Sequence, residues 1–418
     1  MLLEVAIANC YSYAERQVLS LVAHSSEEHE RSNVAHIQAA RSHRVLRSAA
    51  IYGANSSGKS NFLMALTKMR HLVLRSVNFQ RGDKLEIVPF RLNSQARALP
   101  SEFEVQFIAE GVRYQYGFSA TNERIHDEWL FAFPKGQAQT WFQRAWDDEQ
   151  QKHIWSFGNY FQGEKVLWQK STRENALFLS TAVQLNSQQL QPIFDWFQRT
   201  LRFIGIKGIH PFVTAEIIQT GHKEQILKHL RAADIHLADI VVDNIPFEES
   251  IPKELPKELR KVLLSANKSD NALSIKTQRF DDQNQPVEFS FDDESDGTQK
   301  FFCLIGPWLD ALENGYVLFV DELHNSLHTH LAHFLIKLFN NPNTNPNNAQ
   351  LIFTTHDTNQ LDSELLRRDQ IWFCEKNDRQ ATQLYPLTEF KVRKGHQNLE
   401  AAYLSGRYGA IPFIEEFM

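Results

Sequence analysis

The N-terminal part of the chain combines a β-prone run, a short loop and a helical pattern. Residues 44–52 become β-prone toward Tyr52. A few residues later, apolar side chains recur at helical spacing, at Phe62, Leu63, Leu66, Met69 and Leu74. Residues 103–107 and 114–118 then alternate apolar with polar positions, which is typical of half-buried antiparallel strands. The pattern predicts strand, loop and helix, followed by a β-rich segment.

The rest of the chain predicts a second set of elements. Residues 317–320 and 350–355 are runs of β-forming residues, as expected for buried strands of a parallel sheet. Residues 129–155 contain aromatic-rich β segments. The helical patterns lie near residues 182–203, 225–237 and 300–312. Together these patterns predict an α/β fold with a mixed β-sheet core.

Composition narrows the classes of protein. The 418 residues include 44 Lys plus Arg and 50 Asp plus Glu, a formal net charge of −6, and 42% are hydrophobic. That apolar content excludes a disordered chain, and no apolar run reaches the ~18–20 residues of a membrane-spanning helix. The first residues do not resemble a secretory signal. Cys10, Cys303 and Cys374 form neither a disulfide framework nor a zinc spacing, so we expect a reducing, cytoplasmic compartment.

Positive charge is concentrated in one stretch. Residues 31–82 contain nine basic side chains and no carboxylate, which leaves 35 basic against 50 acidic residues elsewhere. One interpretation is a chance excess on solvated helix faces. The other is that this stretch receives a polyanion.

A glycine-containing loop favours the second interpretation. Gly53 and the run Gly58-Lys59-Ser60 fit the pattern G-x-x-x-x-G-K-[ST], and they lie between a predicted strand and helix as a phosphate-binding loop requires. Backbone N–H groups of such a loop face the phosphates at the positive end of the helix. We expect Lys59 between the β- and γ-phosphates of ATP, and the Ser60 hydroxyl on Mg²⁺. The residues expected to line the ATP site are Gly53, Ala54, Asn55, Ser56, Ser57, Gly58, Lys59, Ser60 and Asn61.

Two acids and a histidine follow the buried strands. Asp321 ends the run at residues 317–320, and we expect it to hold Mg²⁺ through water. Glu322 is then the expected general base that polarises the hydrolytic water. His356 ends the strand at residues 350–355. A lone histidine is usually structural, but ligands bind at the carboxyl ends of parallel strands, so we expect His356 to contact the γ-phosphate.

These motifs resemble a known group. The loop at residues 53–60 and the strands ending at Glu322 and His356 look like an ABC-type ATPase head of the SMC, Rad50, RecF and OLD kind. The whole chain more specifically resembles the RloA-like AAA15/AAA21 family of prokaryotic ATPases from phage-defence and abortive-infection loci. The further segments that carry this resemblance are residues 2–13, 173–180, 372–376 and 403–413.

The resemblance implies several further site residues. Residues 294–299, Glu-Ser-Asp-Gly-Thr-Gln, resemble a variant of the ABC signature, which completes the ATP site of a second subunit. ATP would then join two heads, and hydrolysis would loosen them. The alternative is an acidic turn that only caps a helix. Tyr13 is expected to flank the base, and Gln95 is a positional candidate for the Q-loop. The implied signature residues are Ser295, Asp296, Gly297 and Thr298.

Four histidines follow the acid pair, at His324, His328, His330 and His333. His324 and His328 are four residues apart, which on a helix would place them on one face and suggest a metal site. No cysteine or suitably spaced glutamate completes a zinc site. The segment instead resembles the family's D-loop, which follows the dimer seam.

The resemblance also implies a division of the chain. We expect residues 1–120 to form the first half of the ATPase head, residues 121–285 an inserted lid of β segments and mainly helices, and residues 286–418 the second half. The insertion has no sustained heptads, so a long coiled-coil arm is excluded. Only 62 residues follow His356, too few for the Toprim nuclease domain of related OLD proteins. A toxic activity would therefore lie on another chain.

Three functions remain open. The first is an Mg²⁺-dependent ATPase that dimerises through ATP and gates a separate toxin or nuclease, encoded by a neighbouring gene, in anti-phage defence. The second is a RecF- or SMC-like ATPase of DNA repair or maintenance, in which the basic stretch contacts DNA. The third is a scaffold that binds ATP, hydrolyses it slowly and sequesters a toxin.

Overall fold

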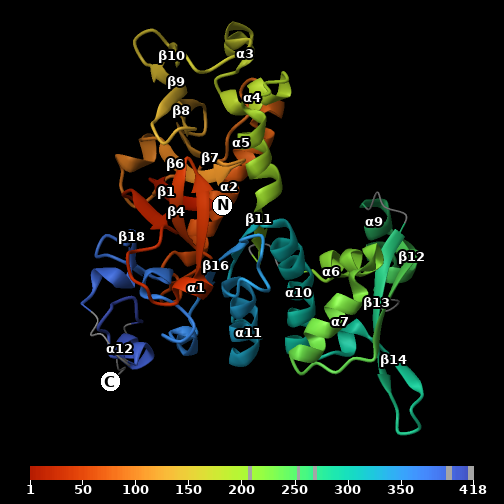
Figure 1. The fold of residues 1–418 in the computed structure, drawn as a ribbon. Coiled ribbons are helices and arrows are strands. Elements are labelled where there is room, and N and C mark those ends of the chain that lie inside the picture. The colour runs from red at the N-terminus through yellow and green to blue at the C-terminus, as the bar shows by residue number, and fades with distance from the viewer. Residues whose placement is uncertain (206–209, 252–254, 267–270, 392–397, 413–418) are drawn as a thin grey trace, which may run out of the picture. The chain divides into compact units, whose positions relative to one another are not determined.

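The computed structural model describes residues 1–205, 210–251, 255–266, 271–391 and 398–412. The chain forms two compact units. The first contains Met1–Lys207, Ala311–His324 and Leu335–Met418, and the second contains Gly208–Asp310 and Asn325–Phe334. Figure 1 shows both units as ribbons.

An antiparallel sheet of seven strands forms one layer of the first unit, in the order β10-β9-β8-β7-β6-β1-β2. Phe103 on β6 lies opposite Phe118 on β7, which confirms the two alternating strands predicted there. The strands are β1 (Leu2–Ala8), β2 (Gln17–Ser20), β6 (Ser101–Ala109), β7 (Val112–Ala120), β8 (Ile125–Phe133), β9 (Gln139–Asp147) and β10 (Lys152–Phe157).

A six-stranded sheet forms the second layer, in the order β11-β15-β16-β5-β17-β18. All neighbours pair in parallel except β17 and β18. Every residue of β5, β15 and β16 is buried, as expected for strands covered on both faces. The strands are β5 (Ser48–Tyr52), β11 (Leu201–Ile204), β15 (Val317–Val320), β16 (Gln350–Thr355), β17 (Ile371–Lys376) and β18 (Thr382–Pro386).

Strand β11 corrects one prediction. The helix expected through residue 203 ends earlier, and Leu201–Ile204 pair in parallel with Val317–Val320 of β15. A four-residue apolar run has no periodicity of its own that distinguishes a strand from the end of a helix. Pairing with a segment more than 100 residues later decides its conformation.

Helix α2 (Lys59–Arg75) contacts strands from both sheets, β6 and β11. Its buried face, which includes Phe62, Leu66 and Met69, belongs to one hydrophobic core shared with residues of both layers. A two-stranded ribbon, β3 (Val34–Ala39) and β4 (Arg41–Leu46), precedes β5. The other helices that lie wholly in this unit are α1 (Glu30–Asn33), α3 (Lys165–Ser171), α4 (Phe178–Gln184), α5 (Gln191–Asp195) and α12 (Leu399–Leu404).

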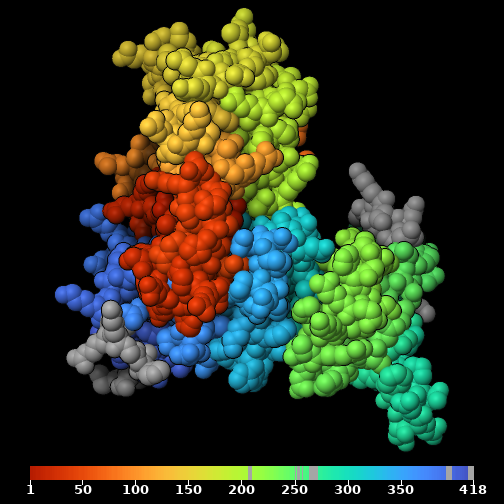
Figure 2. Space-filling model, viewed as in Figure 1, coloured from red at the N-terminus to blue at the C-terminus, as the bar shows by residue number. Residues whose placement is uncertain are grey.

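The second unit combines helices with a three-stranded antiparallel sheet in the order β12-β13-β14. Every residue of β14, which pairs antiparallel with β13, is exposed, and Figure 2 shows this strand at the surface of the unit. Helices α10 and α11 contribute residues to both units. The elements are α6 (Phe212–Ile217), α7 (Lys223–Ala232), β12 (Asp239–Pro246), α8 (Phe247–Ser250), α9 (Lys257–Ala266), β13 (Asn271–Phe280), β14 (Pro286–Ser290), α10 (Asp296–Asn314) and α11 (Thr329–Asn340).

The compact units divide the chain differently from the expected segments. Residues 121–207 belong to the first unit and residues 208–285 to the second, so the segment expected as one inserted lid is split. The reason is that β8, β9 and β10 continue the antiparallel sheet from β7 by backbone pairing. Within the described residues, the longest helix is α10 with 19 residues, and none forms a long coiled-coil arm. No helix among them is long and apolar enough to cross a membrane.

Candidate functional site

The phosphate-loop pattern lies in the structural context that the sequence predicts, between β5 and α2. Glycine is required at two positions of this loop, because neighbouring atoms lie too close to the backbone for a Cβ atom to fit. A Cβ atom on Gly53 would lie 2.2 Å from the carbonyl oxygen of Cys374, and one on Gly58 would lie 2.2 Å from Thr382 Oγ1. Gly58 also has a φ of 114°, which side-chain-bearing residues rarely adopt.

Lys59 is buried inside this loop. Its Nζ donates hydrogen bonds to the carbonyl oxygens of Gly53, at 2.7 Å, and Ala54, at 2.9 Å. Burial lowers the pKa of Lys59 below its ordinary value, while the nearby Cys374, Glu322 and Asp321 act in the opposite direction. A buried ammonium beside backbone carbonyls is a cation that an anionic ligand would stabilise.

The acid pair follows β15 and is held by one threonine of the neighbouring strand. Thr354 Oγ1 donates to Asp321 Oδ1 at 2.6 Å and accepts from the backbone N–H of Glu322 at 2.8 Å. Glu322 has a φ of 50°, an uncommon conformation for a residue with a side chain, and it is exposed. Asp321 is thus fixed by Thr354, while the carboxylate of Glu322 reaches solvent.

His356 follows β16, so the strands that precede Asp321, His356 and Gly53 are adjacent and parallel. The exposed ring of His356 has its Nε2 atom 3.0 Å from Nε2 of His324, and Nδ1 of His324 lies 3.0 Å from Thr355 Oγ1. The structure therefore brings the loop, the acids and the histidine to one edge of the sheet.

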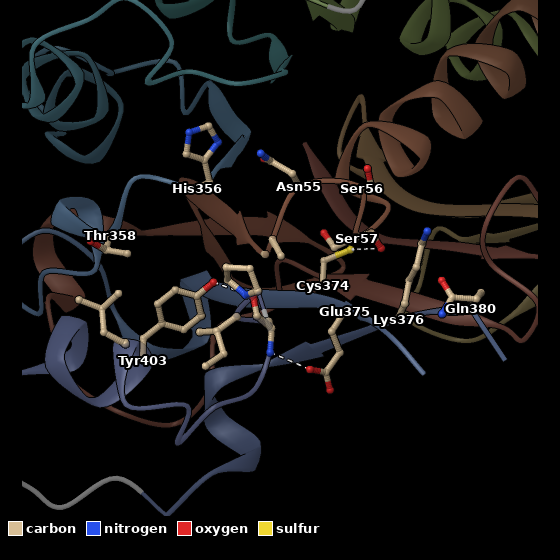
Figure 3. Close-up of a pocket in the computed structure, with 16 residues that line it drawn as sticks. Asn55, Ser56, Ser57, His356, Thr358, Cys374, Glu375, Lys376, Gln380 and Tyr403 are labelled. Atoms are coloured by element: carbon tan, nitrogen blue, oxygen red, sulfur yellow. Dashed lines mark hydrogen bonds between the residues drawn. The ribbon is translucent and has the colours of Figure 1, made fainter. Parts of the chain in front are cut away.

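A pocket of about 870 Å³ lies against the outer residues of the loop, from Gly53 to Ser57. Figure 3 shows His356, Thr358, Cys374, Glu375, Lys376, Gln380 and Tyr403 around it. Its remaining wall is formed by Leu404, Ala410, Ile411 and Pro412.

Sequence reasoning missed the residues from β17 and the carboxyl-terminal segment as site residues. The run at residues 403–413 supported only a family resemblance, and Phe413 lies outside the described residues. The order Gly-Ala-Ile-Pro at residues 409–412 was the available signal, but nothing in its spacing indicates a contact with the loop. That contact exists as a hydrogen bond from the Ala54 N–H to the Ala410 carbonyl, 3.0 Å long.

The side chains at this site are of the types that bind Mg²⁺ and phosphate. Ser60 lies in the first turn of α2, and Asp321 supplies a carboxylate, so both donors are the hard oxygen atoms that Mg²⁺ prefers. Ser57 Oγ is buried and has no hydrogen-bond partner among the described residues. An unsatisfied hydroxyl within a phosphate loop fits a ligand that accepts hydrogen bonds.

Two residues that were expected to contact the nucleotide, Tyr13 and Gln95, do not line the pocket. Tyr13 is fully buried, and its hydroxyl donates to the carbonyl oxygen of Gly58 at 3.1 Å. Its ring is closed to a ligand, so the prediction that it flanks a base is wrong. Gln95 is exposed, precedes a short 3₁₀ helix at Ala96–Ala98 and does not line the pocket. Its assignment to a Q-loop stays a prediction.

Several basic side chains of residues 31–82 make hydrogen bonds or ion pairs with other residues of the first unit. Arg44 donates to Glu30, Arg47 is buried and donates to the carbonyl of Asn345, and Arg70 donates to the carbonyls of Phe197 and Gln198. Lys68 pairs with Glu86 at 3.1 Å. These side chains, with Lys59 in the loop, do not form one free surface for a polyanion.

The signature-like run begins α10 in the second unit. Ser295 Oγ accepts from the Thr298 N–H at 3.2 Å, which is a helix-capping contact. Ser295, Gly297 and Thr298, together with His328 and His330, line a pocket of about 650 Å³. Asp296 is the first residue of the helix. No group of three or more His, Cys, Asp or Glu residues able to hold a metal is found in the described part of the chain, His324, His328, His330 and His333 included.

Comparisons with known proteins place these features in a family. A comparison with curated proteins finds no match. The SMC head domain from Thermotoga maritima is 11% identical, with a TM-score of 0.39, over 92% of this chain and 98% of its own. An SMC head bound to the C-winged helix domain of ScpA is 13% identical, with a TM-score of 0.36, over 92% and 97%.

The family model matches residues 48–362, about three quarters of the chain. This span includes the phosphate loop, the acid pair and His356. The chain therefore has the fold of a P-loop ATPase head and belongs to the family described as "AAA domain, putative AbiEii toxin, Type IV TA system".

Proposed function

We propose that this protein is an ATPase that binds and hydrolyses Mg·ATP where β5, β16 and β15 end. One observation carries the proposal: three adjacent parallel strands lead into the phosphate loop, His356 and the acid pair. The carboxyl ends of parallel strands are where α/β folds bind ligands. The buried Lys59 supplies positive charge at the same edge.

Each residue then has a defined task. The Ser60 hydroxyl would hold Mg²⁺ directly and Asp321 would hold it through water, and the ion would supply positive charge beside the phosphates. Lys59 exchanges its contacts with Gly53 and Ala54 for phosphate oxygens. Glu322 accepts a proton from the water that attacks the γ-phosphorus, as the bond from phosphorus to the ADP oxygen breaks. His356 donates a hydrogen bond to a γ-phosphate oxygen.

Two subunits are proposed to share each nucleotide. Ser295, Gly297 and Thr298 would reach the γ-phosphate of the other subunit through the N-terminal end of α10. The resemblance of residues 294–299 to an ABC signature supports this arrangement. The helix-capping contact of Ser295 is equally consistent with the simpler alternative of a cap.

We further propose an RloA-like role, in which this ATPase gates or sequesters a toxin or nuclease carried by a separate chain in the cytoplasm. The family description, which names a type IV toxin–antitoxin system, supports a partner protein. ATP-linked opening and closing of the head pair would control that partner. Copurification of the product of a neighbouring gene, with and without ATP, tests this role. Recovery of no partner under either condition would contradict it.

Steady-state hydrolysis tests the proposed chemistry. The wild type should release phosphate from Mg·ATP, and Glu322→Gln should lower kcat by about 100-fold or more while leaving ATP binding intact, because only the proton acceptor is lost. Lys59→Ala should abolish binding itself.

Leu99→Asp is a suitable control, since Leu99 is an exposed leucine outside the site. Equal turnover by the wild type and Glu322→Gln would remove Glu322 as the base. Tight ATP binding without turnover by the wild type would instead favour the scaffold.

A further inference from the structure

The pocket against the phosphate loop reaches from His356 and Thr358, after β16, past the loop to the end of β17 and the carboxyl-terminal segment. The strands follow the order β15, β16, β5, β17, so Asp321 lies on one side of the loop and the end of β17, at Cys374–Lys376, lies on the other. The γ-phosphate of a nucleotide belongs near the acids. The nucleoside at the other end of the triphosphate must then leave the loop toward β17.

The carboxyl-terminal segment forms the wall on that side, and it is fixed to the loop. Ala410 accepts hydrogen bonds at its carbonyl from the Ala54 N–H, at 3.0 Å, and from the Tyr403 hydroxyl, at 2.8 Å. The N–H of Ala410 donates to Glu375 Oε2 at 2.7 Å. Figure 3 marks the hydrogen bonds of the Tyr403 hydroxyl and the Glu375 carboxylate with dashed lines. The distance from the wall to the loop is thus set by direct bonds.

The same wall is continuous with the hydrophobic core. Tyr403 is buried and stacks on Phe373, with ring centroids 5.5 Å apart and planes 15° from parallel. Tyr52, the last residue of β5, also lies near Tyr403, with ring centroids 6.3 Å apart. The wall is therefore preformed, and a ligand placed there would not have to pay for ordering it.

The chemistry of the lining suits a base and a ribose. Leu404, which is 59% exposed, Ile411 and Pro412 offer apolar surface, whereas the exposed Lys376 and Gln380 offer polar groups. A flat heteroaromatic ring gains from apolar contact, and ribose hydroxyls need hydrogen-bond partners. The volume of about 870 Å³ is within the usual range of small-molecule pockets, about 300–1,000 Å³.

We propose that the nucleoside of the bound nucleotide lies in this pocket, with its base against Leu404, Ile411 and Pro412 and its ribose toward Lys376 and Gln380. The inference rests on the proposed function, which itself concerns only the phosphates and the hydrolytic step. It assigns to the carboxyl-terminal segment a direct part in recognising adenosine.

Two ligands separate the nucleoside from the phosphates. The slowly hydrolysed ATP analogue AMP-PNP and inorganic tripolyphosphate, each with Mg²⁺, are titrated into the full chain by calorimetry. The variants are Leu404→Asp, Ile411→Asp, Lys59→Ala and the control Leu99→Asp. Leu99 is 58% exposed and does not line the pocket, so it matches Leu404 in exposure. Thermal unfolding checks that each variant is folded.

The expected result is a loss of AMP-PNP affinity of at least tenfold in Leu404→Asp and Ile411→Asp, with tripolyphosphate affinity unchanged. Leu99→Asp should bind both ligands as the wild type does. Unchanged AMP-PNP affinity in both pocket variants would overturn the inference, and so would an equal loss for both ligands, which would mean that the segment only shapes the loop. If Lys59→Ala binds both ligands as the wild type does, the proposed function itself fails.

Discussion

The Nε2 atoms of His324 and His356 lie 3.0 Å apart, so one proton lies between them and one ring must accept it. Thr355 Oγ1 accepts from the Asp357 N–H at 3.0 Å, and its own O–H can donate to Nδ1 of His324, which lies 3.0 Å away. In the tautomer in which Thr355 donates to Nδ1, His324 carries its proton on Nε2 and donates to Nε2 of His356. A neutral His356 then carries its own proton on Nδ1, and this N–H is the group that can donate to a phosphate oxygen.

Removing either histidine should slow ATP hydrolysis, to different degrees. His356→Ala loses a hydrogen bond to a charged group, worth about 1.5–3 kcal/mol, and should lower kcat by about 10–100-fold. His324→Ala removes only the partner that orients His356, so we expect about a 3–10-fold loss. His324→Gln retains an N–H donor and should recover most of it. Equal rates for the wild type and His324→Ala would exclude an orienting role.

Gly58→Ala should disable the phosphate loop without unfolding the protein. The added Cβ would meet Thr382 Oγ1 at 2.2 Å and Ser12 Oγ at 2.8 Å, at a φ of 114°. We expect ATP affinity to fall at least tenfold and the free energy of unfolding to fall by about 1–3 kcal/mol. Gly111→Ala is the control, since Gly111 has a φ of 74° and nothing lies within 4 Å of its added Cβ. It should lose stability but keep ATP affinity, as measured by calorimetry and urea unfolding.

The ion pair between Glu128 and Arg144 should be sensitive to removal of one partner. Both side chains are fully buried, with Arg144 Nη2 2.8 Å from Glu128 Oε2. Glu128 also accepts from the Tyr116 hydroxyl and from the N–H groups of Phe178 and Leu179 at the start of α4. Arg144→Leu leaves that carboxylate uncompensated, and we expect a loss of about 3–5 kcal/mol in the free energy of unfolding.

A double variant separates the pair from its surroundings. Glu128→Gln with Arg144→Leu removes both charges, so urea unfolding should show a smaller loss than Arg144→Leu alone. A loss in the double variant equal to the sum of the two single losses would contradict coupling between the charges.

Acid should destabilise the antiparallel sheet through His153. Burial lowers the pKa of His153 from 6.5 to about 4, and the nearby Arg144 acts in the same direction. Between these values the unfolded chain binds the proton that the folded chain excludes, so stability falls as pH falls from 6.5 toward 4 and is unaffected above 6.5. We expect a loss of about 1–2 kcal/mol, because the ring is only partly buried.

His153→Gln tests this source of acid sensitivity. Glutamine can still donate to the Ile125 carbonyl, which His153 Nε2 contacts at 2.8 Å, but it does not titrate. Urea unfolding at a series of pH values should give a shallower decline for the variant. Parallel curves for the two proteins would assign the acid sensitivity to other groups.

Local pattern was sufficient for the elements that carry the motifs. The strands β5, β15 and β16 and helix α2 occur where apolar runs and helical spacing predicted them. Local pattern was not sufficient for Leu201–Ile204, whose conformation depends on pairing with β15. The family resemblance was misleading for Tyr13, because the hydroxyl of this tyrosine donates to the Gly58 carbonyl and its ring is buried.

By itself, the sequence determined the chemistry at the end of each buried strand: a glycine loop with Lys59, an acid pair and His356. These depend on residue type and on spacing within one segment, which short-range sterics and periodicity control. Only the tertiary structure decided that Ala410 is bonded to Ala54, and that the carboxyl-terminal segment forms a pocket with the loop. Such contacts join residues that are hundreds of positions apart, and they form because strand pairing and burial bring their backbones together.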